Sequence, residues 1–397
     1  MTGTELTPNW GLDHFDPWER RISYGNIWGI YSAMREKAAA HFSDAHGGFW
    51  SIVRYKDVKA AARDHRTFSS AGGTSIGERR NDSSAPAKAP IEYDPPEHTR
   101  YRKAMQEPFL PRKMEEFTAG IRSSVNELMD QISEMGEFDI VKDLAEPVPQ
   151  EVLSKIIGFD DETKVQNREL VLAVVNADLE TKPVAWSRFH DFLRGEIRNR
   201  QARPREDFLS HLCIDEFEGA KFSENELVSM LAALALAGHH TAINGISSVL
   251  RRVANEDVRN SYLADRNLLP KIIEETLRCD PPIHLEGRTT TEPVVVDGVK
   301  IPANASVALV YASANHDGAE FSDPESFDLN RGANQHLTFG HGIHTCFGMH
   351  LARLEMSIVV EEMIRKFPHY RLTGPQIDTG MIYGHHMGWE SMPASID

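Results

Sequence analysis

The sequence predicts a mainly helical protein, in which small β-sheets lie at the edges of a helical bundle. Most of residues 112–260 show the apolar spacing of amphipathic or buried helices. One helix, from about Ser223 to Asn255, is long enough to cross a domain, and the strand-like segments are short. No Gly/Ser-rich or Pro-rich linker and no internal repeat divides the chain, so we expect a single domain over residues 1–397.

The first hundred residues contain short elements and one long loop. Residues 48–54 predict a strand, and residues 57–64 a helix. Residues 69–96 are rich in Ser, Gly, Ala and Pro, which indicates a loop of a length that is usually functional or mobile. The helix that follows carries His98 and Arg102 four positions apart, on one face.

The helix from Ser223 to Asn255 begins with a capping box, formed by Ser223 and Glu226. Residues 227–237 are almost all apolar, so this helix should cross the core. His239 and His240 lie in its middle and argue against a membrane span.

The last third of the chain alternates helix and short strands. Pro270 suits the first turn of a helix that ends before Asp280. Residues 294–296 and 307–310 predict strands, with a turn at Asp297-Gly298.

Composition narrows the function classes. The net charge of −16 argues against nucleic-acid binding and against binding to an anionic membrane surface. Cys213, Cys279 and Cys346 are odd in number and have no paired spacing, which predicts a reducing, cytoplasmic environment. Charges interrupt the first fifty residues, so neither a signal sequence nor a membrane anchor is expected there.

One short segment carries the strongest chemical signal. It runs from Phe339 to Gly348, with Cys346 between glycine-framed loop residues and the start of an amphipathic helix. Gly340 and Gly342 allow positive φ and a close approach of the backbone to a flat ligand. The free N–H groups of the helix should lower the pKa of the thiol. This geometry can present a thiolate to a haem iron.

The segment has the order Phe-Gly-x-Gly-x-His-x-Cys-x-Gly-x-x-Leu-Ala-Arg, which resembles the haem-binding signature of the cytochrome P450 family. The resemblance extends at least over residues 95–353. It implies the family's helical fold around a buried haem b, with Cys346 as the axial ligand of the iron. It also implies a monooxygenase that uses O2 and takes electrons from a ferredoxin with an NAD(P)H-dependent reductase.

The resemblance also implies which residues surround the haem. Glu275 and Arg278 form the Glu-x-x-Arg pair behind it, although such a pair can also be a surface salt bridge. The usual third partner, an arginine, is replaced by Ser326, and Arg331 and His336 are candidates for its role. The expected propionate partners are His98, Arg102, Arg288 and His344, and the other expected haem contacts are Ala237, Phe339, Gly340 and Gly348.

Residues 237–241, Ala-Gly-His-His-Thr, resemble the family's oxygen-activation motif. Gly238 would leave a groove for O2, and Thr241 would supply the activating hydroxyl. His240 replaces the usual carboxylate. It is either a proton relay, or a hydrogen-bonded residue beside a water chain, or a sign of an unusual reaction.

Position alone suggests the substrate contacts and the docking face. Leu234, Ala237, residues 283–285 and residues 383–387 are candidate substrate contacts, and the loop at 74–76 and the segment 171–186 should cover the pocket. For each single residue, ordinary core packing is the alternative. His284, Glu286, His385 and His386 give it a polar corner or face solvent. Arg112, Lys113 and Arg353 are candidates for positive charge near Cys346. The single pocket candidates are Thr74, Leu234, Ile283, His284, Leu285, Tyr383 and His386.

The predicted substrate is a small-to-medium hydrophobic molecule, with a lean to terpenoids because the signature resembles the camphor-type branch. Two alternatives stay open. One is a haem-thiolate enzyme for oxidative coupling, cyclisation or peroxide-driven chemistry, and the other is a non-catalytic haem sensor. Fold and class do not choose among substrates, since variable loops shape the pocket.

Overall fold

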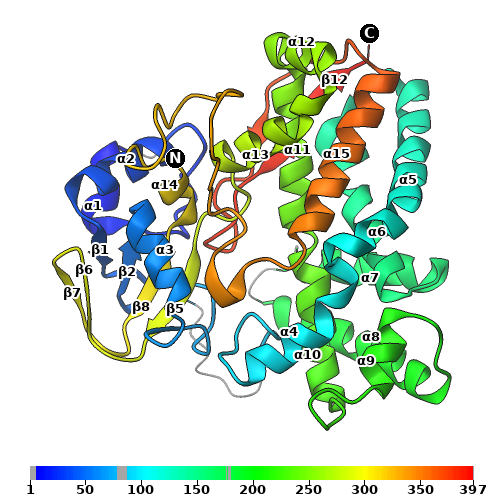
Figure 1. Ribbon diagram of the computed structural model, residues 1–397, viewed down its shortest axis with the longest axis horizontal. Helices are drawn as coiled ribbons and strands as arrows, with labels where there is room; N and C mark the ends of the chain where they lie inside the picture. The colour runs from blue at the N-terminus through cyan, green and yellow to red at the C-terminus, as the bar shows by residue number, and fades with distance from the viewer. Residues whose placement is uncertain (1–5, 78–86, 176, 178–179, 397) are drawn as a thin grey trace.

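The computed structural model describes residues 6–77, 87–175, 177 and 180–396. Helices form most of the molecule, and the largest sheet lies to one side with the N-terminal helices (Figure 1). The α-helices are α1 (Gly11–His14), α2 (Ile27–Lys37), α3 (Tyr55–Arg63), α4 (Glu97–Met105), α5 (Met114–Met135), α6 (Pro147–Ile157), α7 (Asp161–Val175), α8 (Lys182–Ala202), α9 (Phe208–Ile214), α10 (Glu224–Ala237), α11 (His240–Ala254), α12 (Glu256–Ala264), α13 (Leu269–Cys279), α14 (Tyr311–Asn315) and α15 (Met349–Lys366).

The largest sheet has the strand order β1-β2-β8-β5-β3, in which β2 and β8 run parallel and the other neighbours antiparallel. The other sheets are a β6–β7 hairpin, a β4-β12-β9 sheet and a β10–β11 pair. The strands are β1 (Ala40–Ser43), β2 (Phe49–Ile52), β3 (Phe68–Ser69), β4 (Glu137–Asp139), β5 (Glu286–Thr290), β6 (Val294–Val296), β7 (Val299–Ile301), β8 (Ser306–Leu309), β9 (Arg371–Leu372), β10 (Ile377–Asp378), β11 (Trp389–Ser391) and β12 (Pro393–Ser395).

Most of the predicted elements are confirmed. Strand β2 and helix α3 lie where residues 48–64 predict them, and α4 follows the long loop. Helix α13 has Pro270 in its first turn, and the β6–β7 hairpin turns at Asp297-Gly298.

The prediction of one continuous helix from Ser223 to Asn255 is wrong. The capping box of Ser223 and Glu226 opens α10 as expected, but α10 ends at Ala237. Gly238 and His239 separate it from α11, and the backbone of His239 has φ −89° and ψ −85°, outside the helical region. By length and composition the stretch 224–254 could cross a membrane, yet much of it is buried inside the protein, as in the core helix of a globular fold.

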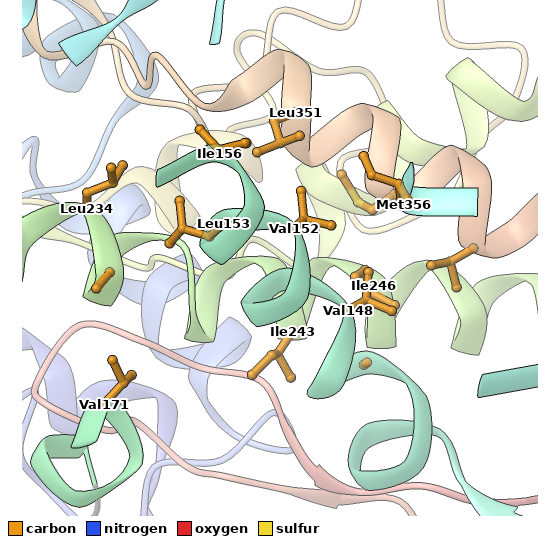
Figure 2. Packing of buried hydrophobic residues seen from close by; sticks show 14 of the residues in the cluster. Val148, Val152, Leu153, Ile156, Val171, Leu234, Ile243, Ile246, Leu351 and Met356 are labelled. Carbon is orange, nitrogen blue, oxygen red and sulfur yellow. The ribbon is translucent and has the colours of Figure 1, made fainter. Parts of the chain in front are cut away.

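The main core lies where α5, α6, α11 and α15 meet. Figure 2 shows Val148, Val152 and Ile156 of α6 packed between α11 and α15. A Cβ on Gly245 of α11 would lie 3.3 Å from the sulfur of Met356 on α15, so the two helices approach closely. Full burial of each such aliphatic side chain contributes about 1.5–3 kcal/mol. This packing fixes the start of α15 relative to the break between α10 and α11.

Candidate functional site

The loop before α15 is held in a fixed shape by its own backbone. Gly340 and Gly342 have φ of 69° and 75°, and a Cβ on Gly342 would lie 2.6 Å from the carbonyl oxygen of Ala62. The Cys346 N–H donates to the carbonyl oxygen of Phe339 over 2.8 Å. The predicted positive φ is confirmed at both glycines, and Gly342 lets the loop pack against the end of α3.

Cys346 stands at the N-terminus of α15 with an exposed side chain, whereas Cys213 and Cys279 are buried. Burial of its surroundings raises the pKa of the Cys346 thiol, while the Gly348 N–H and the charges of Arg102 and Arg353 lower it. The N–H groups at the helix terminus lower this pKa as predicted, but desolvation outweighs them, so the expected low pKa is wrong. A bound metal cation is what would hold the sulfur as thiolate.

Three segments bring basic side chains together beside this loop. The rings of His98 on α4 and His344 lie 4.6 Å apart. Burial lowers the pKa of His344 to about 2, and Arg288, His98 and Arg102 lower it further. His98 Nε2 is buried and has no hydrogen-bond partner within the described residues.

Within the described residues the two arginines of this cluster, Arg102 and Arg288, have no salt-bridge partner, although the Glu286 carboxyl group interacts with the charge of Arg288. Arg288 donates there only to the carbonyl oxygen of Gly287, over 2.6 Å. Asp94, near His98, already accepts hydrogen bonds from Ser69 and Ser70. A buried basic cluster of this kind is matched to a ligand with negative charge.

The Glu275–Arg278 pair is buried, with side chains 1% and 0% exposed, so it is no surface salt bridge. Arg278 binds both carboxylate oxygens, over 2.8 and 2.9 Å. Arg331 is the third partner, since its Nε lies 3.0 and 3.1 Å from the same two oxygens. His336 binds Glu274 instead, over 3.2 Å.

Ser326 contributes through its backbone. Its carbonyl oxygen accepts from Arg278 over 2.9 Å and from Arg331 over 3.2 Å. The arginine that the family usually has at position 326 is thus replaced by Arg331, five residues later in the chain. The segment that leads to the Cys346 loop is thereby tied to α13.

The break between α10 and α11 leaves part of the backbone and side chains uncovered. Ala237 is exposed although its neighbours Leu234 and Ala235 are buried. The Thr241 hydroxyl donates to the carbonyl oxygen of Ala237 over 2.7 Å. Helices α11 and α15 start at the same end of the core, which places this break near the Cys346 loop (Figure 1).

The sequence model described as "Cytochrome P450" matches residues 153–379. Cytochrome P450 107B1 of Saccharopolyspora erythraea is 33% identical over 377 residues, 91% of this chain and 93% of its own length. Steroid C26-monooxygenase of Mycobacterium tuberculosis is 32% identical, over 92% of this chain and 95% of its own. The crystal structure of CYP108D1 from Novosphingobium aromaticivorans superposes with a TM-score of 0.86 at 26% identity, covering 98% of this chain and 97% of that one.

The chain belongs to the cytochrome P450 family. It is a P450 monooxygenase with the predicted fold of a helical bundle and small β-sheets. The family binds a haem whose iron takes a cysteine thiolate as ligand. The residues of this P450 fit that group, because an exposed Cys346 lies beside a basic cluster with an unpartnered His98 Nε2.

The histidines at the helix break differ in their surroundings. His239 Nδ1 accepts from the side-chain amide of Gln150 over 2.9 Å. His240 Nε2 is buried without a hydrogen-bond partner in the described residues, and burial lowers the pKa of His240 to about 4. His240 is therefore neutral at pH 7.

The predicted pocket residues divide into two groups. Ile283, Tyr383 and His386 are partly exposed, and the rings of Tyr383 and His386 lie 5.8 and 6.1 Å from that of His240. Thr74 is 6% exposed, and its carbonyl oxygen accepts from the Gly287 N–H over 2.6 Å.

The other candidates, Leu234, His284 and Leu285, are packed in the core. His284 and Leu285 are both 0% exposed, and His284 Nδ1 lies 3.1 Å from the Tyr31 hydroxyl. Leu234 is 5% exposed and belongs to the main core. The structure therefore gives these three side chains packing roles, because they are buried while Ile283 and Glu286 are partly exposed.

The three residues suggested for the docking face are already paired. Arg353 donates to both carboxylate oxygens of Glu274, over 2.6 and 2.7 Å. Burial would raise the pKa of Glu274, but Arg353 and His336 outweigh it and lower this pKa to about 2. Arg112 and Lys113 pair with Glu107 and Glu116 on the surface.

Lys88 and Glu92 form an ion pair over 3.5 Å that the sequence did not predict. They lie in a loop between Ala and Pro residues, where no periodicity marks a side chain as directed inward. Their separation by four positions was the one available signal, since that spacing allows an ion pair within a turn.

Proposed function

We propose that this P450 inserts one oxygen atom from O2 into a small-to-medium organic substrate, with electrons from a ferredoxin and its NAD(P)H-dependent reductase. The observation that carries the proposal is the exposed Cys346 thiol beside the basic cluster of His98, Arg102, Arg288 and His344. Its relatives include proteins named as steroid, erythromycin and vitamin D3 hydroxylases. The three free cysteines are consistent with a reducing cytoplasm.

Each residue near the site has a proposed part in holding the cofactor. Cys346 would bind the iron, and the basic cluster would bind the propionates. Phe339, Gly340 and Gly348 would shape the loop that carries Cys346, and Ala237 and Gly238 would border the haem site. When bound, a haem with a thiolate ligand supplies O2 activation and favours O–O cleavage.

Thr241 holds a proton at its Oγ1. Because this hydroxyl donates to the carbonyl oxygen of Ala237, its lone pairs stay available to accept a hydrogen bond from water. We propose that the hydroxyl would rotate away from Ala237 and hand its proton to a hydrogen-bonded water, and that a second water would replace it. A positioned proton donor of this kind contributes about 10²–10⁴-fold to a rate.

His240 acts in this proposal as a neutral imidazole. Its Nε2 has no partner among the described residues, and its low pKa means that it gives and accepts protons through hydrogen-bonded water rather than as a stored imidazolium. It thereby keeps the relay role that a carboxylate has elsewhere in the family. The alternative, that His240 is a satisfied hydrogen-bonding residue, finds no partner for Nε2 among the described residues.

The electron donor approaches the side of the molecule near Cys346. Arg353 is held by Glu274, so we propose that Arg112 and Lys113 meet the donor. Their partners Glu107 and Glu116 are 52% and 58% exposed, and exposed pairs of this kind exchange partners at little cost.

The test is turnover of the haem-loaded protein with a ferredoxin, its reductase and NAD(P)H under ¹⁸O2, over a panel of steroids, terpenoids and macrolides. The proposal predicts a product that contains one ¹⁸O atom. Product without ¹⁸O would show coupling or cyclisation instead. Absence of both product and substrate-stimulated NAD(P)H oxidation across the panel would favour a sensor.

A further inference from the structure

Helix α6 supports the break between α10 and α11 through two side chains that the proposed reaction does not use. Gln150 and Leu153 lie three positions apart on α6, so they share one face of that helix. A Cβ on Gly238 would lie 3.1 Å from Cδ2 of Leu153, and the side-chain Nε2 of Gln150 lies 2.9 Å from Nδ1 of His239. One face of α6 therefore contacts both residues that separate α10 from α11.

The hydrogen bond between Gln150 and His239 is buried. Gln150 is 3% exposed and His239 is 2% exposed, so bulk water does not compete for the bond. Burial lowers the pKa of His239 to about 3, and the charges of His240 and Arg168 lower it further. The bond therefore joins two neutral groups, and it fixes the orientation of the His239 ring without placing a charge at the break.

Core packing alone does not explain a glutamine at position 150. Its neighbours Val148 and Val152 on α6 are buried apolar residues. Gln150 Oε1 is buried and has no hydrogen-bond partner within the described residues. An unmatched buried amide oxygen costs stability that an apolar side chain of the same size would not cost. The hydrogen bond to His239 is the contact that an apolar residue could not make.

His239 connects the two helices through its backbone. Its N–H donates to the carbonyl oxygen of Leu236, over 3.2 Å, and its own carbonyl oxygen accepts from the N–H of Ile243, over 3.2 Å. The conformation of His239 thus sets where α11 starts relative to the end of α10. Because Gln150 holds the ring of His239, α6 takes part in setting that start.

The break decides how the carbonyl oxygen of Ala237 is bound. In an unbroken helix this oxygen would accept from the N–H of Thr241, four residues later. At the break it accepts from the Thr241 hydroxyl, over 2.7 Å. The resting position of the hydroxyl that is proposed to supply a proton therefore depends on the shape of the break.

We propose that Gln150 is a positioning residue for oxygen activation. Its side-chain amide holds the His239 ring and thereby keeps the start of α11 where the Thr241 hydroxyl meets the carbonyl oxygen of Ala237. Gln150 acts through His239 and Thr241 and takes no part in proton transfer itself. The inference rests on the proposed function and deepens it, because it assigns a residue of α6, 89 positions before His239, to the work of Thr241.

The first test is hydrogen–deuterium exchange of the haem-loaded protein, which needs no substrate. It compares wild type with Gln150→Met, because methionine keeps the length of glutamine and has no donor for His239 Nδ1. The matched control is Ser154→Ala, since Ser154 lies one turn further along α6, is 1% exposed, and its hydroxyl has no partner among the described residues. Gln150→Met should speed exchange of the His239 and Ile243 amides about three- to tenfold, and Ser154→Ala should match wild type.

Turnover then separates positioning from a general loss of structure. At equal haem content, Gln150→Met should lower the product formed per NAD(P)H about three- to tenfold and release H2O2, while KM stays within about twofold of wild type. Gln150→Glu, whose carboxyl group can still hydrogen-bond to His239 Nδ1, should recover most of that yield. Gln150→Met combined with Thr241→Ala should give the yield of Thr241→Ala alone, because Gln150 acts through that hydroxyl.

Any of three results would overturn the inference: unchanged exchange at His239 and Ile243 in Gln150→Met, an unchanged yield per NAD(P)H, or losses from Gln150→Met and Thr241→Ala that simply multiply. If Gln150→Met does not bind haem, His239→Leu removes the same hydrogen bond from the other side and carries the same expectations. A wild-type protein that binds no haem, or oxidises no NAD(P)H with any substrate, contradicts the proposed function instead, and amide exchange at the break still tests the contact with Gln150.

Discussion

Arg331 should be one of the most sensitive positions for stability outside the hydrophobic core. Its side chain is 7% exposed and donates to both oxygens of Glu275 and to the carbonyl oxygens of Ser322, Asp323 and Ser326. Replacing it by alanine leaves Arg278 as the only charged partner of Glu275. Loss of one partner from a buried charged network costs about 3–5 kcal/mol.

The assay is urea unfolding of the haem-loaded protein, followed by the Soret band and by far-ultraviolet circular dichroism. The matched control is Arg112→Ala, because the Arg112–Glu107 pair is 68% and 52% exposed and should contribute about 0–1 kcal/mol. Ser326→Ala is a second control, since only its carbonyl oxygen supports the network. An Arg331→Ala variant as stable as Arg112→Ala would refute the assignment of Arg331 as the third partner.

Three further predictions concern charge and proton transfer. The pKa of the Glu274 carboxylate is lowered to about 2, so this group contributes stability above pH 4.5 that is lost as the pH falls toward 2. Glu274→Gln should therefore cost about 3 kcal/mol of unfolding free energy at pH 7 and much less in acid. An equal cost at both pH values in urea titrations would contradict this. Thr241→Ala should lower the product formed per NAD(P)H about tenfold or more and release H2O2. Thr241→Ser keeps the hydroxyl and should keep most of that yield. An unchanged yield per NAD(P)H in the alanine variant would show that Thr241 does not deliver protons. Burial lowers the pKa of His240 to about 4, so His240 should add no step to the pH–rate profile between pH 6 and 9. His240→Asn should therefore change the rate by the same factor at every pH in this range. A wild-type step near pH 6.5 that this variant abolishes would disprove the neutrality of His240.

The parts of the fold that depend on local sequence could be predicted. A capping box at Ser223, Pro270 at a helix start and the Asp297-Gly298 turn act over a few residues, and all three are present in the structure. The helix break at Gly238-His239 could not be predicted, because glycine within a helix costs only about 1 kcal/mol and tertiary packing decides whether the helix continues.

The site depended on contacts that spacing alone does not show. Arg331 could be named only as a candidate, since its contact with Glu275 spans 56 positions. The burial of the side chains after α13 could not be predicted either. Ile283 and Glu286 are partly exposed, while His284 and Leu285 between them are buried. The prediction of a low pKa for the Cys346 thiol was wrong. The helix terminus that lowers this pKa can be predicted from the sequence, whereas the desolvation that raises it depends on the fold.

The central claim is that Cys346 holds a haem iron as thiolate. The measurement that tests it most directly is the visible spectrum of the dithionite-reduced protein under carbon monoxide, compared with Cys346→Ala and with Cys213→Ala as the control. The account predicts a strongly red-shifted Soret band in wild type and in Cys213→Ala, which is lost in Cys346→Ala. A protein without haem, or a red-shifted band that persists without Cys346, would contradict it.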